Sequence, residues 1–113
     1  MYIAHYSVHT DMLKNTVRAC KNECRKKYKA VRSNLGETKR DEYSQKIADT
    51  LLNLDVYQNA DVLLAYASIG DEVATYSIIN HALQCGKRVA LPYCIPNTSN
   101  MDFYYINSIT DLK

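Results

Sequence analysis

Two short apolar runs on either side of a helical segment most constrain the fold of this chain. The first run, VLLAYAS, spans residues 62–68, and the second, RVALPY, spans residues 88–93. Between them, Thr75 can cap a helix that Gly86 closes. The apolar face of this helix comprises Ile78, Ile79, Ala82 and Leu83. Short apolar runs of this kind are typical of buried strands, so the order strand, helix, strand predicts a right-handed parallel crossover unit.

Two helices are predicted before this unit and one strand after it. The first helix runs from residue 13 until Gly36 ends it, because apolar residues recur there every three or four positions. This apolar stripe, which we expect to be buried, comprises Leu13, Val17, Cys20, Cys24, Tyr28, Val31 and Leu35. The second helix begins at Thr38 as N-cap, with Asp41 three residues later, and runs to about Asn53. Its apolar face comprises Tyr43, Ile47, Leu51 and Leu54. The segment MDFYYI, residues 101–106, alternates enough to form a third strand.

The predicted fold class is therefore α/β, with two leading helices followed by a β-α-β-β segment. We expect a three-layer α/β/α arrangement around a mostly parallel sheet, preceded by a mobile N-terminal tail over residues 1–12. The 113 residues suffice for one domain. An α/β sheet normally has more than three strands and helices on both faces. The sequence is thus expected to be the front part of a longer protein, with an incomplete domain.

The cysteines and the apolar segments exclude several classes of protein. Cys20, Cys24, Cys85 and Cys94 form no CxxC pair, and no regular histidine spacing completes a zinc site. We expect four reduced, mostly buried thiols. No apolar run approaches the length of a membrane span, and the first residues, MYIAHYSVHTD, lack the pattern of a signal peptide. A cytoplasmic protein without membrane association is expected.

The first predicted helix concentrates positive charge. Between Lys14 and Arg32 the chain carries eight Lys or Arg residues and one acidic residue, a local balance of +7 within a chain of net charge +2. On a helical wheel, Lys21 and Arg25 lie within about 40° of each other and border the apolar stripe. Such cations can bind phosphate, since Lys supplies a compact charge and Arg a planar fork. From periodicity alone, a solvated helix face is the favoured explanation of this charge.

The loop ASIGDEVATYS after the first apolar run is a second candidate site. Ligands of α/β proteins bind outside the carboxyl ends of strands, often against helix N-termini. The Glu72 carboxylate could accept hydrogen bonds from the ring N–H and amino groups of a heterocycle. It could also simply be solvated, or interact with the dipole of the helix that follows.

The ordered segments of the chain resemble a known enzyme family. A series of residues and segments has the order and spacing of the first part of a 5-formyltetrahydrofolate cyclo-ligase. The series comprises Lys21, Arg25, Arg32 and Leu35, followed by SQKIADTLLNLDVYQNADVLLAY, SIGDEVAT, GKRVALP and MDFYYINSITDL. This family is also called 5,10-methenyltetrahydrofolate synthetase. The resemblance runs from about Lys21 to the end and makes residues 13–113 the N-terminal part of a single cyclo-ligase-like domain. Each motif is weak by itself, whereas the series is fairly specific.

The resemblance implies an ATP- and magnesium-dependent ligase that converts 5-formyltetrahydrofolate to 5,10-methenyltetrahydrofolate and releases ADP and phosphate. By position, Lys21 and Arg25 match the family's residues that contact ATP phosphates, and Arg32 matches a third basic position. Glu72 matches the glutamate that holds the pterin ring, and Ala67 an apolar residue of the folate pocket. Further folate contacts are implied for Met101 and Phe103.

The family's Gly-rich phosphate loop and its magnesium ligand belong to a second part that this sequence lacks. We therefore assign no catalytic or metal-binding residue here, and expect the 113 residues alone to be inactive. The resemblance further implies a monomer when complete, and no nucleic-acid partner. The alternative hypothesis is a non-catalytic module that binds nucleic acid or another polyanion through the basic first helix. The helix has little aromatic interleaving and no recognised reading motif, which disfavours this alternative.

Overall fold

A computed structural model describes the backbone of residues 2–112 and the side chains of residues 12–112. The chain divides into two compact units, residues 1–36 and residues 37–113. Each unit is described by itself. No helix in the described part of the chain is both long and apolar enough to cross a membrane.

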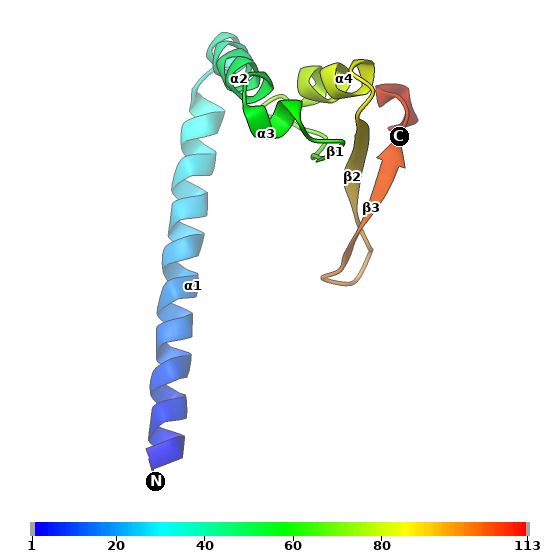
Figure 1. Ribbon diagram of the computed structural model, residues 1–113. Helices are drawn as coiled ribbons and strands as arrows, with labels where there is room; N and C mark the ends of the chain where they lie inside the picture. The colour runs from blue at the N-terminus through cyan, green and yellow to red at the C-terminus, as the bar shows by residue number, and fades with distance from the viewer. Residues whose placement is uncertain (1, 113) are drawn as a thin grey trace. The chain divides into compact units, whose positions relative to one another are not determined.

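The first unit is one long helix, α1, from Tyr2 to Asn34 (Figure 1). It begins eleven residues earlier than the apolar pattern predicts, so most of the predicted N-terminal tail is helical, and its mobility stays a prediction. Gly36 follows the helix with a φ of 81°, a conformation that glycine adopts at little cost. The prediction of a buried apolar stripe is wrong for the residues from Leu13 to Val31, which are all exposed, while Leu35 is half-buried. Among the described residues of this unit, α1 has no second element on which to pack.

The second unit contains three helices, three strands and a short 3₁₀ helix. They are α2 (Glu37–Leu52), α3 (Asp55–Gln58), β1 (Val62–Leu64), α4 (Tyr76–Gln84), β2 (Arg88–Cys94), β3 (Met101–Ile106) and η1 (Ile109–Asp111). The bounds of β3 are as predicted, and α3 and η1 were not predicted. Because α2 begins at Glu37, Thr38 lies inside the helix and is not its N-cap.

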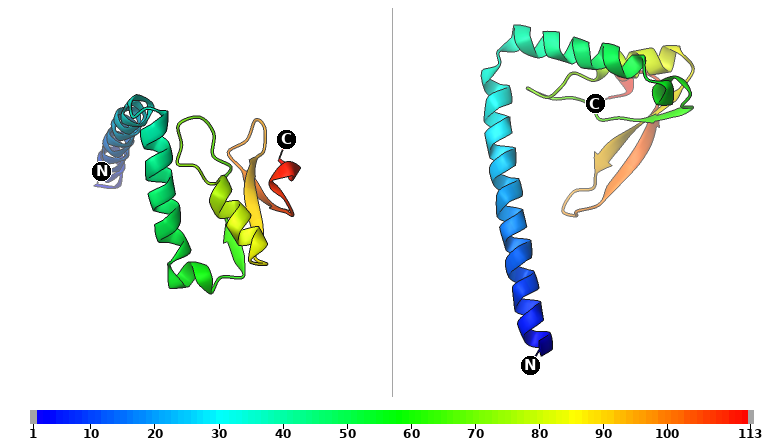
Figure 2. Two further views of the ribbon diagram at one scale, coloured as in Figure 1. Left: turned by 90° about the horizontal axis from the view of Figure 1, so that it is seen from above. Right: turned by 60° about the vertical axis from the view of Figure 1, so that its left-hand side comes forward.

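The sheet has the order β1-β2-β3, with β1 parallel and β3 antiparallel to β2. The parallel pair confirms the predicted crossover connection through α4 (Figure 2). The first strand is shorter than the apolar run 62–68 because the chain leaves the ladder after Leu64 and becomes a loop. The fold class is α/β, as predicted, and the sheet is mixed.

The core of this unit lies between α4 and the central strand β2. Ile79 of α4 and Val89 of β2 are completely buried, and Ala82, Leu91 and Tyr57 complete the buried cluster. On α2 the buried residues are Ser44 and Ala48, while Tyr43 and Ile47 of the predicted apolar face are 46% exposed. Figure 2 shows α2 and α4 side by side, in agreement with their contacts.

Tyr57 joins α3 to the end of α4. Its hydroxyl oxygen lies 2.8 Å from His81 Nδ1, and the Lys87 ammonium lies 5.1 Å from the centre of its ring. Burial, and secondarily the electrostatic interaction with Cys85, raise the pKa of the Tyr57 phenol above its ordinary value of 10.0. Tyr57 is therefore a neutral hydrogen-bonding residue at physiological pH.

The second face of the sheet is apolar and open. Side chains of β1 and β3 on this face are about half exposed or more: Leu64, Met101, Phe103 and Tyr105. The second helical layer of a three-layer fold stays a prediction. The prediction of mostly buried cysteines is wrong, since Cys20, Cys24, Cys85 and Cys94 are all free and exposed.

Candidate functional site

The loop between β1 and α4 holds Glu72 through a short local hydrogen-bonded turn. The Ile69 backbone N–H donates to Glu72 Oε2 at 3.0 Å, and the Glu72 N–H donates to the Ile69 carbonyl at 3.2 Å. Gly70 lies between them with a φ of 58°, which glycine tolerates without a side-chain clash. A carboxylate has about four acceptor sites, so this turn fixes the orientation of Glu72 and leaves capacity to bind a ligand.

Thr75 fastens the two ends of the same loop together. Its hydroxyl donates to the Tyr66 carbonyl at 2.6 Å and accepts from the Ser68 N–H at 3.1 Å, while the Thr75 N–H donates to Ser68 Oγ at 3.1 Å. Thr75 is the residue before α4, as predicted, but its side chain makes no capping bond to the helix. The hydroxyl braces the loop instead, which the capping pattern alone could not reveal.

A further anchor of the loop comes from α2. The buried Ser44 hydroxyl accepts a hydrogen bond from the Ala74 N–H at 3.0 Å, across thirty residues of sequence. Ala67 lies earlier in the loop, half-buried against the core of the unit. The sequence carries no signal for Ser44, because serine is common on helix surfaces and its partner is a backbone group.

The other two folate candidates lie on β3. In the register of the sheet, Phe103 pairs with Pro92 and Met101 with Cys94, at the carboxyl end of β2. The loop that carries Glu72 follows the carboxyl end of β1, which is parallel to β2. Both groups therefore lie at the same end of the parallel pair, where α/β proteins bind ligands.

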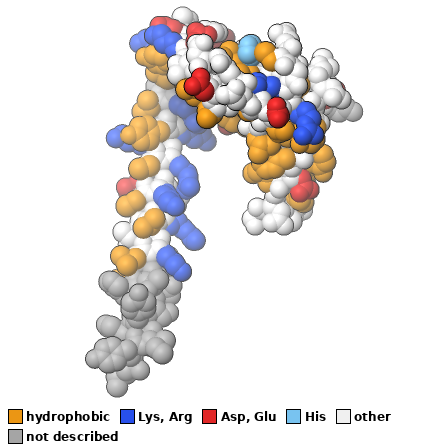
Figure 3. Space-filling model, in the orientation of Figure 1, with side chains coloured by type: hydrophobic (Ala, Val, Ile, Leu, Met, Phe, Trp, Pro, Cys, Tyr) orange, Lys and Arg blue, Asp and Glu red, His pale blue; other side chains and the backbone are white. Residues whose placement is uncertain are grey.

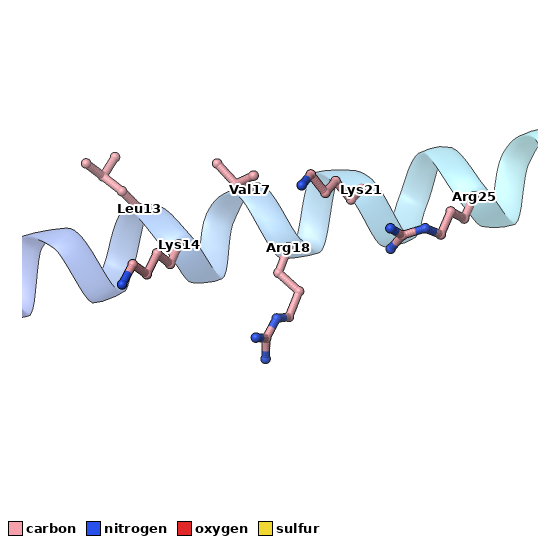
Figure 4. Close-up of a pocket in the computed structure, with 6 residues that line it drawn as sticks. All are labelled: Leu13, Lys14, Val17, Arg18, Lys21 and Arg25. Atoms are coloured by element: carbon pink, nitrogen blue, oxygen red, sulfur yellow. The ribbon is translucent and has the colours of Figure 1, made fainter. Parts of the chain in front are cut away.

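The phosphate candidates are exposed along α1. Lys21 and Arg25 line a shallow hollow with two cations and two apolar residues of the preceding turns, Lys14, Arg18, Leu13 and Val17 (Figure 4). Arg25 is oriented by a hydrogen bond from its Nη1 to Asn22 Oδ1 at 3.2 Å. A second hollow, one to two turns further on, has Arg25 and Arg32 among its lining residues. Lys21 and Arg25 thus share one side of the helix, as the wheel predicts, in a different unit from Glu72.

The described residues contain no cluster of side chains that could bind a metal ion. Within residues 12–112, no three His, Cys, Asp or Glu side chains lie close enough together to hold a metal ion. The candidate residues are therefore a set of exposed cations on α1 in the first unit and a hydrogen-bonded carboxylate, Glu72, in the second.

The fold is α/β, with a hydrogen-bonded loop at the carboxyl end of a parallel strand pair. A sequence model of the 5-formyltetrahydrofolate cyclo-ligase family matches residues 17–113. The chain belongs to this family, as the sequence motifs indicated.

A solved structure supports the same assignment. The NMR structure of 5,10-methenyltetrahydrofolate synthetase from Aquifex aeolicus is similar, with a TM-score of 0.62 and 29% sequence identity. The match covers 79% of this chain and 44% of that chain, so the present chain spans less than half of the length of that protein. No curated protein sequence matches.

Proposed function

We propose that these residues form the N-terminal part of an ATP-dependent 5-formyltetrahydrofolate cyclo-ligase. The proposed reaction converts 5-formyltetrahydrofolate to 5,10-methenyltetrahydrofolate with release of ADP and phosphate. The family match over residues 17–113 carries the proposal. The exposed cations of α1 and the braced loop of Glu72 support it, because they supply the two kinds of recognition that the substrates need.

In this proposal the cations of α1 position ATP. Lys21 and Arg25 contact its phosphates and Arg32 contributes a third positive charge, which together offset the negative charge that repels an incoming nucleophile. Phosphoryl transfer depends mostly on such positioning and charge neutralisation. The proposed magnesium ligands lie outside the described residues. The complete enzyme is proposed to be a cytoplasmic monomer.

The folate is assigned to the second unit. Glu72 accepts hydrogen bonds from the pterin ring, and Ala67, Met101 and Phe103 provide apolar contacts. The hydrogen bond from Ile69 N–H fixes one oxygen of Glu72, which lowers the entropic cost of orienting the carboxylate toward the ring. Turnover requires residues beyond those described, so binding of each substrate is the direct test of this chain.

The variant Lys21→Ala is expected to weaken ATP binding by the chain about tenfold, because a hydrogen bond to a charged group contributes about 1.5–3 kcal/mol and each 1.4 kcal/mol is a factor of ten. Isothermal titration calorimetry measures the affinity. Lys26→Ala is the matched control: it removes the same charge from an exposed position about 140° away around the helix. Equal affinities of the two variants would contradict the phosphate assignment.

The variant Glu72→Gln is expected to weaken binding of 5-formyltetrahydrofolate about tenfold. The glutamine side-chain oxygen can still accept from the Ile69 N–H, so the turn stays intact while the negative charge that holds the pterin is lost. Glu42→Gln on α2 is the control, since this exposed residue only pairs with Lys46 at the surface. An unchanged affinity in Glu72→Gln, measured by the same calorimetry, would exclude the pterin assignment.

A polyanion-binding module remains the second candidate function, favoured by the local charge of +7 on an exposed helix. Binding to random duplex DNA that weakens steeply with salt, together with no binding to ATP or folate, would support it. Binding of ATP that Lys21→Ala weakens and Lys26→Ala does not would favour the cyclo-ligase.

A further inference from the structure

The part of helix α1 whose side chains are described carries two exposed stripes that run side by side (Figure 3). The apolar stripe comprises Leu13, Val17, Cys20, Cys24, Tyr28 and Val31. The basic stripe comprises Lys14, Arg18, Lys21, Arg25, Lys29 and Arg32. Leu13, Val17, Tyr28 and Val31 are between 49% and 60% exposed, so about half of each side chain is in water.

The two stripes form one continuous amphipathic surface. On a wheel with Lys21 at zero, the apolar stripe occupies about 260–340° and the basic stripe about 0–80°. Glu23, the only acidic residue between Lys14 and Arg32, lies at about 200°, on the opposite side of the helix. Over residues 14–32, a partner that approaches this surface therefore meets apolar and cationic groups together and no carboxylate, whereas Asp11 precedes this stretch at about 80° on the same wheel.

The N-terminal end of this surface lies outside the region shared with the family. The family match begins at residue 17, whereas α1 begins at Tyr2. Leu13 and Lys14 extend the two stripes by one turn before that point, with Val17 and Arg18 continuing them. Leu13 and Lys14 therefore lie outside the region shared with the family, whereas Val17 and Arg18 lie at its start.

We propose that the surface of α1 formed by Leu13, Lys14, Val17 and Arg18 binds an anionic lipid surface. The helix would lie in the plane of the membrane, with Leu13 and Val17 entering the boundary between headgroups and acyl chains. Lys14 and Arg18 would lie beside the anionic headgroups, and each cation near such a surface adds to the attraction. The expectation of no membrane association rested on the lack of a spanning segment and of a signal peptide, and this surface needs neither.

Lipid explains the surface better than nucleic acid does. Nucleic-acid backbones attract cations but would leave the adjacent apolar stripe in water, since non-specific affinity comes from phosphate contacts. A lipid surface uses both stripes at once. The lining of the hollow includes apolar and cationic side chains, among them Leu13, Val17, Lys14 and Arg18 (Figure 4), and so has this dual character.

Co-sedimentation of the full chain with vesicles tests the proposal. Vesicles of phosphatidylcholine alone are compared with vesicles of phosphatidylcholine and phosphatidylserine. The chain is expected to bind only the vesicles that contain phosphatidylserine, and less strongly as salt is added, because salt screens the attraction. Absence of binding to both kinds of vesicle would overturn the proposal.

Two matched pairs of variants separate the stripes from the rest of the helix. Leu13→Ser is expected to weaken vesicle binding about tenfold, from lost apolar burial. Met12→Ser is its control, because Met12 is 63% exposed but lies about 100° from Leu13, on the opposite side from the basic stripe, and should have little effect. Lys14→Gln is expected to weaken binding about fivefold, and Lys26→Gln less.

The same variants identify the alternative partners. The proposal would be overturned if Leu13→Ser and Met12→Ser weakened vesicle binding equally. It would also be overturned if duplex DNA abolished vesicle binding while Leu13→Ser left vesicle binding unchanged. Circular dichroism of each variant checks that α1 is still helical. Lys21 and Arg25 are unchanged in all four variants, so lipid binding and ATP binding can fail independently.

Discussion

Replacing Ile79 with alanine is expected to lower the free energy of unfolding of the second unit by about 2–5 kcal/mol. Ile79 is completely buried on α4 and belongs to the cluster with Val89 and Leu91 of the central strand. Its truncation removes buried methyl groups and leaves a cavity between helix and sheet. Urea denaturation of the full chain, followed by near-ultraviolet circular dichroism of its tyrosines, measures the loss. A unit with so small a core has a low free energy of unfolding, so this loss is a large fraction of it.

Ile69→Ala is the matched control for this substitution. Ile69 is 72% exposed in the loop between β1 and α4, so the same change of side chain removes little buried surface. Its effect is expected to stay within about 0.5 kcal/mol. If Ile69→Ala destabilised the unit as much as Ile79→Ala, the core would not lie between α4 and β2.

The pattern around Ile79 also explains why much of the fold could be predicted from the sequence. The helix of Ile78 and Ile79, the apolar strand of Val89 and the alternating strand of residues 101–106 each have a local period that matches their structure. Local periodicity fixes which residues share a face. The bounds of β3 and the parallel pairing across α4 followed from it.

Helix α1 shows the limit of that reasoning. The spacing from Leu13 to Val31 correctly predicts a helix with one apolar stripe, but periodicity cannot say whether a partner covers the stripe. In the structure these side chains are half exposed. The same limit applies to α2, where the small residues Ser44 and Ala48 are buried and the larger Tyr43 and Ile47 are not. Burial depends on neighbours distant in sequence.

The candidate site was also predicted only in part from the sequence. The resemblance assigned roles to Glu72 and Lys21, and those assignments stay predictions until binding is measured. The supports of the loop were missed, because Ser44 and Ser68 act through backbone groups brought close by folding. Thr75 was singled out for its position before a helix, and its hydroxyl turned out to brace the loop.

The second large effect is therefore expected for Thr75→Val, which keeps the shape of the side chain and removes its hydroxyl. The Tyr66 carbonyl and the Ser68 N–H would each lose their partner in a site that is only 7% exposed at Thr75. An unsatisfied buried polar group costs about 1–3 kcal/mol, so the loss in stability should be about 2–4 kcal/mol. Urea denaturation measures it, and hydrogen exchange should show lower protection of the Ser68 amide.

Thr98→Val is the control, because Thr98 makes the same two kinds of bond at an exposed position. Its hydroxyl donates to the Ile95 carbonyl at 2.9 Å and accepts from the Asn100 N–H at 3.2 Å. Water can replace both bonds there, so we expect an effect below about 1 kcal/mol. Equal losses in the two variants would mean that the Thr75 hydroxyl is not buried in solution.

The brace also links stability to the proposed function. Thr75 and Ser68 hold the ends of the loop that presents Glu72, so Thr75→Val should weaken binding of 5-formyltetrahydrofolate even where the chain remains folded. ATP binding should be unaffected, because Lys21 and Arg25 belong to the other unit. Calorimetry with each ligand separates the two effects. A parallel loss of both affinities would indicate general unfolding, whereas loss of folate binding alone would indicate that the loop orients Glu72.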